Sequence, residues 1–154
     1  MNFEIVTDSS CNLTEEMIDD LGVHILPLVF MSEGQEYRSY LKGEKTDLKQ
    51  FYTMMREGKV FTTSLPNMAD AEALFRSLLE AGKDVLYLGF SSALSGTHEA
   101  VRMLCMQLAS EYPERTVRAV GTLAASGGQG LLVYHACMKA REGATLEETA
   151  RWVE

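Results

Sequence analysis

Short apolar runs alternate with longer amphipathic stretches along the chain. Runs at residues 3–6, 23–30, 84–90 and 116–120 predict four strands, and between them apolar residues recur at the three- and four-residue spacing of helices that bury one face. The run over 84–90 is apolar almost throughout, which is typical of a strand buried on both faces. Pro27, inside the second run, favours an edge strand or a bulge at that point.

Turn and capping residues mark where the helices begin and end. Thr46 is expected to cap a helix that ends at Gly58, and Asn67 is expected to begin the next helix. The stretch 31–45 between the second strand and the first of these helices is polar and irregular, and it predicts a short hairpin around Gly34.

This order of elements predicts the fold class. Strands that alternate with helices indicate a three-layer α/β/α domain with a mainly parallel sheet. With 154 residues, the chain suits one domain, residues 1–154. The last helical pattern is still running at Glu154, so we expect the chain to continue into a further domain.

Composition and charge narrow the class of partner. Hydrophobic residues make up 46% and charged residues 23%, which is typical of a folded soluble domain, and the net charge of −8 disfavours nucleic acid and membrane surfaces. No apolar run is long enough for membrane insertion. Cys11, Cys105 and Cys137 are too widely spaced for a disulfide framework or a zinc site, and reduced cysteines fit a cytoplasmic protein. We expect neither a metal nor a cofactor.

Four segments between the predicted elements are rich in hydroxyls and glycines. In a parallel sheet the ligand lies outside the carboxyl ends of the strands, so residues 8–10, 62–64, 91–97 and 121–130 should gather there. Asp8 is the single ionisable residue in these segments. Hydroxyls and helix N-terminal N–H groups can hold an oxyanion, but no general base stands beside a nucleophile. The pattern therefore predicts a binding site without catalysis.

Several alternatives stay open on the residues alone. Ser95 has the position of a helix cap, with no ligand required. The segment 127–130 (Gly-Gly-Gln-Gly) is half of a dinucleotide-binding loop, and no acidic residue follows at the position that would bind a ribose. His98 follows the third hydroxyl segment and is expected at the surface rather than in catalysis. An enzyme or sensor for a small phosphorylated ligand, held at Ser95-Gly96-Thr97, is the competing function.

Four motifs together resemble the bacterial DegV-like family over essentially the whole chain. They are Asp8-Ser9, Thr63-Ser64-Leu65-Pro66, the run from Phe90 to Thr97, and Ser126-Gly127-Gly128-Gln129-Gly130. The resemblance implies the N-terminal domain of a two-domain protein that binds a long-chain fatty acid between its domains. It also implies that the bound acid is presented to a separate ATP-dependent kinase, which phosphorylates the carboxylate.

The resemblance also assigns candidate ligand-binding residues. It places carboxylate contacts on Thr63 and Ser95, and the neighbouring motif residues complete the set: Ser64, Gly96, Thr97, Ser9 and Ser126. The chain departs from the family pattern at Leu65, where glutamine is usual, and at Gly121-Thr122, where the family has an aspartate. The second departure removes an acid from the edge of the expected site.

Overall fold

A four-stranded parallel sheet forms the centre of the protein in the computed structural model, which describes residues 3–45 and 47–154. Its strands are β1 (Phe3–Asp8), β2 (His24–Leu26), β6 (Asp84–Gly89) and β7 (Val117–Gly121), arranged in the order β2-β1-β6-β7. Every neighbouring pair is parallel. The predicted parallel α/β class is confirmed.

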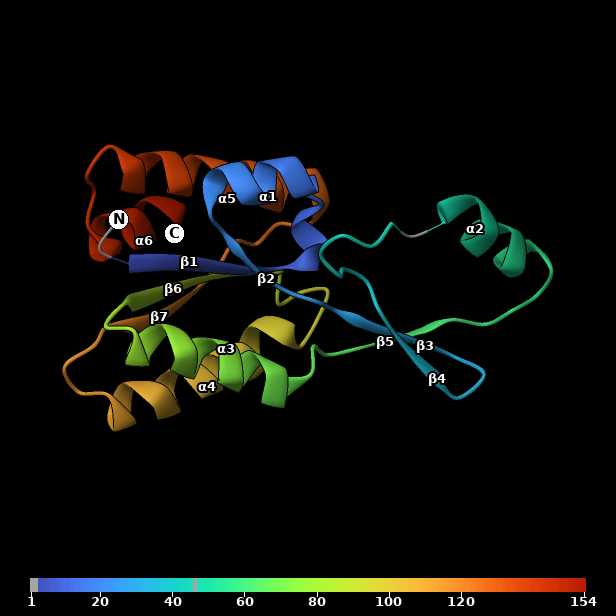
Figure 1. Ribbon diagram of the computed structural model, residues 1–154, viewed down its shortest axis with the longest axis horizontal. Helices are drawn as coiled ribbons and strands as arrows, with labels where there is room; N and C mark the ends of the chain where they lie inside the picture. The colour runs from blue at the N-terminus through green and yellow to red at the C-terminus, as the bar shows by residue number, and fades with distance from the viewer. Residues whose placement is uncertain (1–2, 46) are drawn as a thin grey trace.

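Helices cover both faces of this sheet (Figure 1). One face carries α1 (Glu15–Leu21), α5 (Ser126–Arg141) and α6 (Leu146–Val153), and the other carries α3 (Met68–Glu80) and α4 (Thr97–Glu111). The sheet and these helices are called the core below. The three-layer arrangement predicted from the alternation of patterns is therefore present.

The central strands divide their side chains between two hydrophobic clusters. Ile5 and Leu86 belong to the cluster under α1, α5 and α6, whereas Val6 and Tyr87 belong to the cluster under α3 and α4. This alternation follows from the two-residue period of a strand. Burying each such side chain stabilises the fold by about 1.5–3 kcal/mol, so both layers are anchored on β1 and β6.

A second unit, called the arm below, projects beyond the core (Figure 1). It is an antiparallel sheet of β3 (Val29–Ser32), β4 (Gln35–Arg38) and β5 (Thr62–Ser64), in the order β4-β3-β5, together with α2 (Leu48–Arg56).

Aromatic side chains hold the arm together. The ring centroids of Phe30 and Phe51 lie 5.7 Å apart, and those of Phe51 and Phe61 lie 4.6 Å apart. The chain leaves the core at Pro27 and returns at Pro66, and both prolines line one small cavity. The arm thus has its own apolar contacts. It meets the core near these two prolines and again between β4 and α2, where Tyr40 packs against the cluster under α1 and the Gly43 N–H donates to Glu15.

The prediction of one strand over residues 23–30 is wrong. The segment forms β2 in the core sheet and then β3 in the arm, with Pro27 between them. Proline has no N–H to donate to a ladder, so the chain leaves the parallel sheet at this residue. The hairpin around Gly34 is confirmed: Glu33 and Gly34 have φ values of 51° and 79°, as a tight hairpin turn requires.

The predicted helix starts have different outcomes. Thr46 lies outside the described residues, and the side chain of Asp47 accepts a hydrogen bond from the N–H of Gln50 at the start of α2. Asn67 caps α3 as predicted, accepting from the N–H groups of Ala69 and Asp70.

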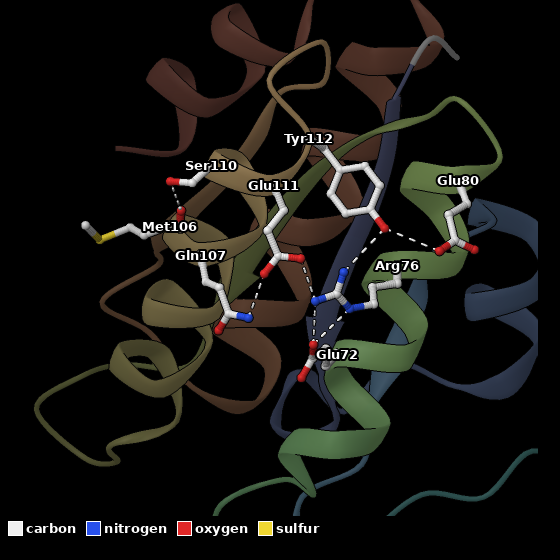
Figure 2. Close-up of polar contacts among 8 residues, drawn as sticks. All are labelled: Glu72, Arg76, Glu80, Met106, Gln107, Ser110, Glu111 and Tyr112. Atoms are coloured by element: carbon white, nitrogen blue, oxygen red, sulfur yellow. Dashed lines mark hydrogen bonds and ion pairs between the residues drawn. The ribbon is translucent and has the colours of Figure 1, made fainter.

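A polar network joins α3 to the C-terminal end of α4. Figure 2 shows Arg76 between Glu72 and Glu111, with N–O distances of 2.7 Å to each, while Tyr112 donates to Glu80. Hydrogen bonds to Glu72 and then to Glu111 raise the pKa of the Arg76 guanidinium above its ordinary value. The network holds the far end of α4, whose other end reaches the carboxyl edge of the sheet.

The glycine-rich start of α5 packs closely on the turn after β1. This turn is a short 3-10 helix, η1 (Ser9–Cys11). A Cβ atom on Gly130 would lie 2.4 Å from the carbonyl oxygen of Cys11, whereas a Cβ on Gly127 would meet nothing within 4 Å. The close approach explains why glycine is needed at position 130.

We therefore expect Gly130→Ala to destabilise the protein by about 1–3 kcal/mol, because the added methyl group would press on backbone atoms. Gly127→Ala is the matched control, and it should be neutral or stabilising by up to about 1 kcal/mol through helix propensity. Urea unfolding of the two variants measures both effects. Equal stability of the two variants would contradict the close-packing argument.

Candidate functional site

A pocket of about 700 Å³ lies at the carboxyl ends of β1 and β6, between the core and the arm. Its lining combines hydroxyl and apolar side chains with the amide of Asn12, and none of the described residues that line it is charged. The lining residues are Ser9, Ser10, Asn12, Leu28, Val29, Phe30, Ser39, Thr63, Ser64, Leu65, Phe90, Leu94, Ser95 and Gly96. The strand-end position is the one at which open parallel sheets bind ligands.

The fully buried carboxylate of Asp8 organises the wall behind this pocket. Its Oδ2 accepts from the Tyr87 hydroxyl at 2.8 Å and from the Phe90 N–H at 2.9 Å. Its Oδ1 accepts from the N–H and hydroxyl of Ser10 and from Nε2 of Gln129. A buried carboxylate needs such donors, so Asp8 joins the ends of β1 and β6 to the first turn of α5.

Tyr87 and His98 form the packed layer beside Asp8. Burial, followed by the charge of Asp8 and its hydrogen bond, raises the pKa of the Tyr87 hydroxyl well above its ordinary value. The His98 ring stacks on Tyr87 at 6.3 Å and sits over Gly89 and Gly121, where a Cβ would meet the ring at 2.7 and 3.3 Å. Burial lowers the pKa of His98. His98 is therefore a half-buried packing residue, contrary to the expectation that it lies at the surface.

Tyr87→Phe should cost about 1–3 kcal/mol of stability at neutral pH, because the buried Asp8 oxygen loses a donor. The pKa of Tyr87 is raised in the folded protein. The Tyr87 hydroxyl therefore contributes its full stabilisation below about pH 10, where tyrosine in the unfolded chain is also protonated. Above that pH the unfolded chain loses the proton first, so the stability difference between wild type and Tyr87→Phe should shrink. Urea unfolding from pH 7 to 11 measures it; a constant difference would contradict the prediction.

The structure brings Thr63 and Ser95 to the same pocket from different units. Thr63 and Ser64 are exposed residues of β5 in the arm, whereas Ser95 and Gly96 precede α4 in the core. The N-cap position of α4 is Gly96 and has no side-chain cap, so Ser95 lies one residue before the predicted capping position. Its hydroxyl nevertheless accepts from the N–H of Thr97 at 3.1 Å. It therefore combines that contact with a position facing the pocket.

Two candidate residues lie outside the pocket lining. Thr97 is fully buried, and its hydroxyl is hydrogen-bonded to that of Ser95 at 2.9 Å. Ser126 is exposed at the start of α5 and does not line the pocket.

The glycine-rich segment 121–130 thus has a structural role at this edge. Of its residues, Gln129 reaches Asp8 and also donates to Thr7 at 3.0 Å, while Gly130 permits the close packing. Conversely, Asn12 and Ser39 line the pocket although the sequence offered no signal for them, because both lie outside the strand-end segments.

Within residues 3–45 and 47–154, no group of three or more His, Cys, Asp or Glu side chains is placed to hold a metal ion. None of the helices in that part of the chain is both long and apolar enough to cross a membrane.

The parallel sheet, its two helical layers and the pocket at the strand ends define an α/β domain with a candidate binding pocket. The family model described as "Uncharacterised protein, DegV family" matches residues 2–154. The chain therefore belongs to the DegV family, as its motifs indicated. A DegV domain-containing protein of Clostridium perfringens is 38% identical over 152 residues, which are 99% of this chain and 52% of the relative.

Solved structures agree with this assignment. A DegV family protein from Thermus thermophilus, described for fatty acid binding, matches with a TM-score of 0.84 and 34% identity, over 99% of this chain and 52% of that one. A Thermotoga maritima protein whose structure was described as revealing a fatty acid binding function matches with a TM-score of 0.81 and 30% identity, over 99% and 54%. The chain thus spans about half the length of these relatives.

Proposed function

We propose that this chain forms one wall of a binding site for a long-chain fatty acid and carries no catalytic activity. The observation that supports this most directly is the pocket itself, whose described lining residues join a group of hydroxyls to a run of apolar side chains without any charge. A fatty acid has the same division between a polar head and an apolar chain. The fatty-acid-binding relatives of similar fold support the same conclusion.

The carboxylate would be held by neutral donors. Thr63 and Ser95 face the pocket from the arm and the core, and Ser64 and the Gly96 backbone lie beside them. A hydrogen bond to a charged group contributes about 1.5–3 kcal/mol, so two or three hydroxyls are sufficient to orient the head group. The N-terminus of α4 adds the favourable end of its helix dipole at the same place.

The acyl chain would supply most of the affinity. Leu28, Phe30, Leu65, Phe90 and Leu94 give the pocket an apolar side. Burial of each methylene contributes about 0.8 kcal/mol. Leu65, which stands where the family has glutamine, extends this apolar side next to Gly96, at 3.7 Å from the position of a Cβ there.

A second domain would close the site. The relatives are about twice as long as this chain, and an open pocket cannot cover a long acyl chain on all sides. We further propose, on the family resemblance, that the closed protein presents its fatty acid in the cytoplasm to a separate kinase that phosphorylates the carboxylate.

A site for a small phosphorylated ligand is the competing function. Phosphate sites use Lys or Arg for charge-assisted hydrogen bonds, and neither is found among the lining residues that the structure describes. Native mass spectrometry of the intact protein purified from cells, followed by lipid extraction, separates the two functions. A co-purified fatty acid supports our proposal, whereas a phosphorylated metabolite in its place would overturn it.

Replacing Ser95 with alanine in the intact protein should weaken fatty-acid binding about 10- to 150-fold, the equivalent of one charged hydrogen bond. Loss of the contact with Thr97 should also cost about 1 kcal/mol of stability. Ser92→Ala is the matched control, because Ser92 is exposed in the same turn and outside the pocket. Calorimetric titration with palmitic acid measures both variants. Wild-type affinity in a folded Ser95→Ala protein would leave Ser95 with its contact to Thr97 alone.

Residues 1–154 expressed alone should bind fatty acid far more weakly than the intact protein. Full burial of a sixteen-carbon chain is worth roughly 12 kcal/mol, and losing half of the covering surface removes several kcal/mol, which is thousands-fold in affinity. Parallel titrations of palmitic acid into the two proteins make the comparison. Equal affinities would mean that the pocket of this domain is complete by itself.

A further inference from the structure

The two sides of the pocket belong to units that pack separately. Thr63 is carried by β5 of the arm, whose aromatic rings contact one another, and Ser95 is carried by the core. Neither of the two core clusters includes Phe30, Phe51 or Phe61. The separation of Thr63 from Ser95 therefore depends on how the arm is attached to the core.

Ser9 contacts the chain at the root of the arm. Its hydroxyl accepts from the N–H of Leu28 at 2.9 Å and is hydrogen-bonded to the hydroxyl of Ser39 at 2.5 Å. Leu28 directly precedes β3 and Ser39 directly follows β4, and the Ser39 N–H donates to the Leu28 carbonyl at 2.8 Å. A single side chain thus touches both strands of the first hairpin where they meet the core.

Ser9 is itself fixed to the core. It follows Asp8, whose carboxylate is held by Tyr87, Phe90 and Gln129, and its carbonyl accepts from the N–H of Asn12 in the same turn. Other side-chain ties between the arm and the core are the ion pairs of Arg38 with Asp70 and of Lys42 with Asp19, and the Gly43 N–H donates to the Glu15 carboxylate at 3.1 Å. The two ion pairs are about half-exposed or more, and such pairs contribute about 0–1 kcal/mol. Ser9 differs from these ties because one side chain contacts both ends of the first hairpin.

The hydroxyl pair has limited capacity for a ligand. Ser9 and Ser39 have one hydrogen each, and one of the two is used between them. The Leu28 N–H occupies a lone pair of Ser9 as well. The bonds of Ser9 are thus directed mainly at the arm, although Ser9 also lines the pocket.

We propose that Ser9 is a positioning residue, which sets the spacing of Thr63 and Ser95 by holding the root of the arm to the end of β1. This role rests on the proposed fatty-acid site, because spacing matters only if one head group spans both units. It differs from the direct ligand contact that the family motif suggested for Ser9.

Distances between spin labels on the arm and the core test the proposal in the intact protein. Lys49→Cys in α2 and Met103→Cys in α4 provide exposed label sites on the two units. Cys11, Cys105 and Cys137 are buried, and burial raises the pKa of Cys105 to about 12 and that of Cys137 to about 11, so these thiols stay protonated and react poorly.

Ser9→Ala should broaden the label-to-label distance distribution and weaken palmitic acid binding about 3- to 30-fold, as expected for losing one or two hydrogen bonds. Ser64→Ala is the matched control. Ser64 lines the same pocket, and its side chain makes no hydrogen bond within the described residues. The distances between the two spin labels should therefore stay as in wild type.

An unchanged distance distribution in Ser9→Ala would overturn the proposal, whatever happens to the affinity. Broadened distances with wild-type affinity would overturn it too, because the spacing would then have no effect on binding. If the intact wild-type protein binds no palmitic acid, the proposed function fails, while the distances still show whether Ser9 holds the arm.

Discussion

A carboxylate that is removed from water must find its hydrogen-bond donors inside the protein, and Asp8 imposes this requirement on the whole strand-end region. Its donors come from β6, from the residue after β6, from the turn after β1 and from α5. These segments are far apart in sequence, and any shift of one of them would leave an oxygen of Asp8 short of a partner. The core wall behind the pocket is therefore fixed by Asp8, whereas Thr63 is carried by β5 of the arm and lies outside this network.

The core was predictable because its elements obey simple periods. The apolar run of β6 and the spacing of apolar residues in α3 and α4 need no knowledge of tertiary contacts. The arm was not predictable in the same way. All four residues of β4 are exposed, and the arm is held by Phe30, Phe51 and Phe61, which come from three separate segments. Pro27 was correctly identified as a disruption, but a single sequence does not reveal that the chain passes there from one sheet to another.

The candidate site also has a part that could be predicted from the sequence and a part that could not. The rule that ligands lie at the carboxyl ends of parallel strands accounts for the segments around Ser9 and Ser95, which line the pocket. Thr63 also lines the pocket, but it lies on the antiparallel strand β5 of the arm, and the family motif is what assigned it. The rule does not distinguish a segment that faces the ligand from one that packs behind it, so it also selected the start of α5. Ser39 was invisible to it, because that residue reaches the pocket through the fold of the arm and not through the end of a core strand.

The closeness of Pro27 and Pro66 gives the arm the character of an insertion. A segment whose two ends are neighbours can be inserted at a small entropic cost of loop closure. That cost rises only slowly as the segment becomes longer. The order β2-β1-β6-β7 is complete without any residue of the arm. The arm can therefore change in length and composition while the parallel sheet stays intact. One wall of the pocket can vary in this way without loss of the core fold.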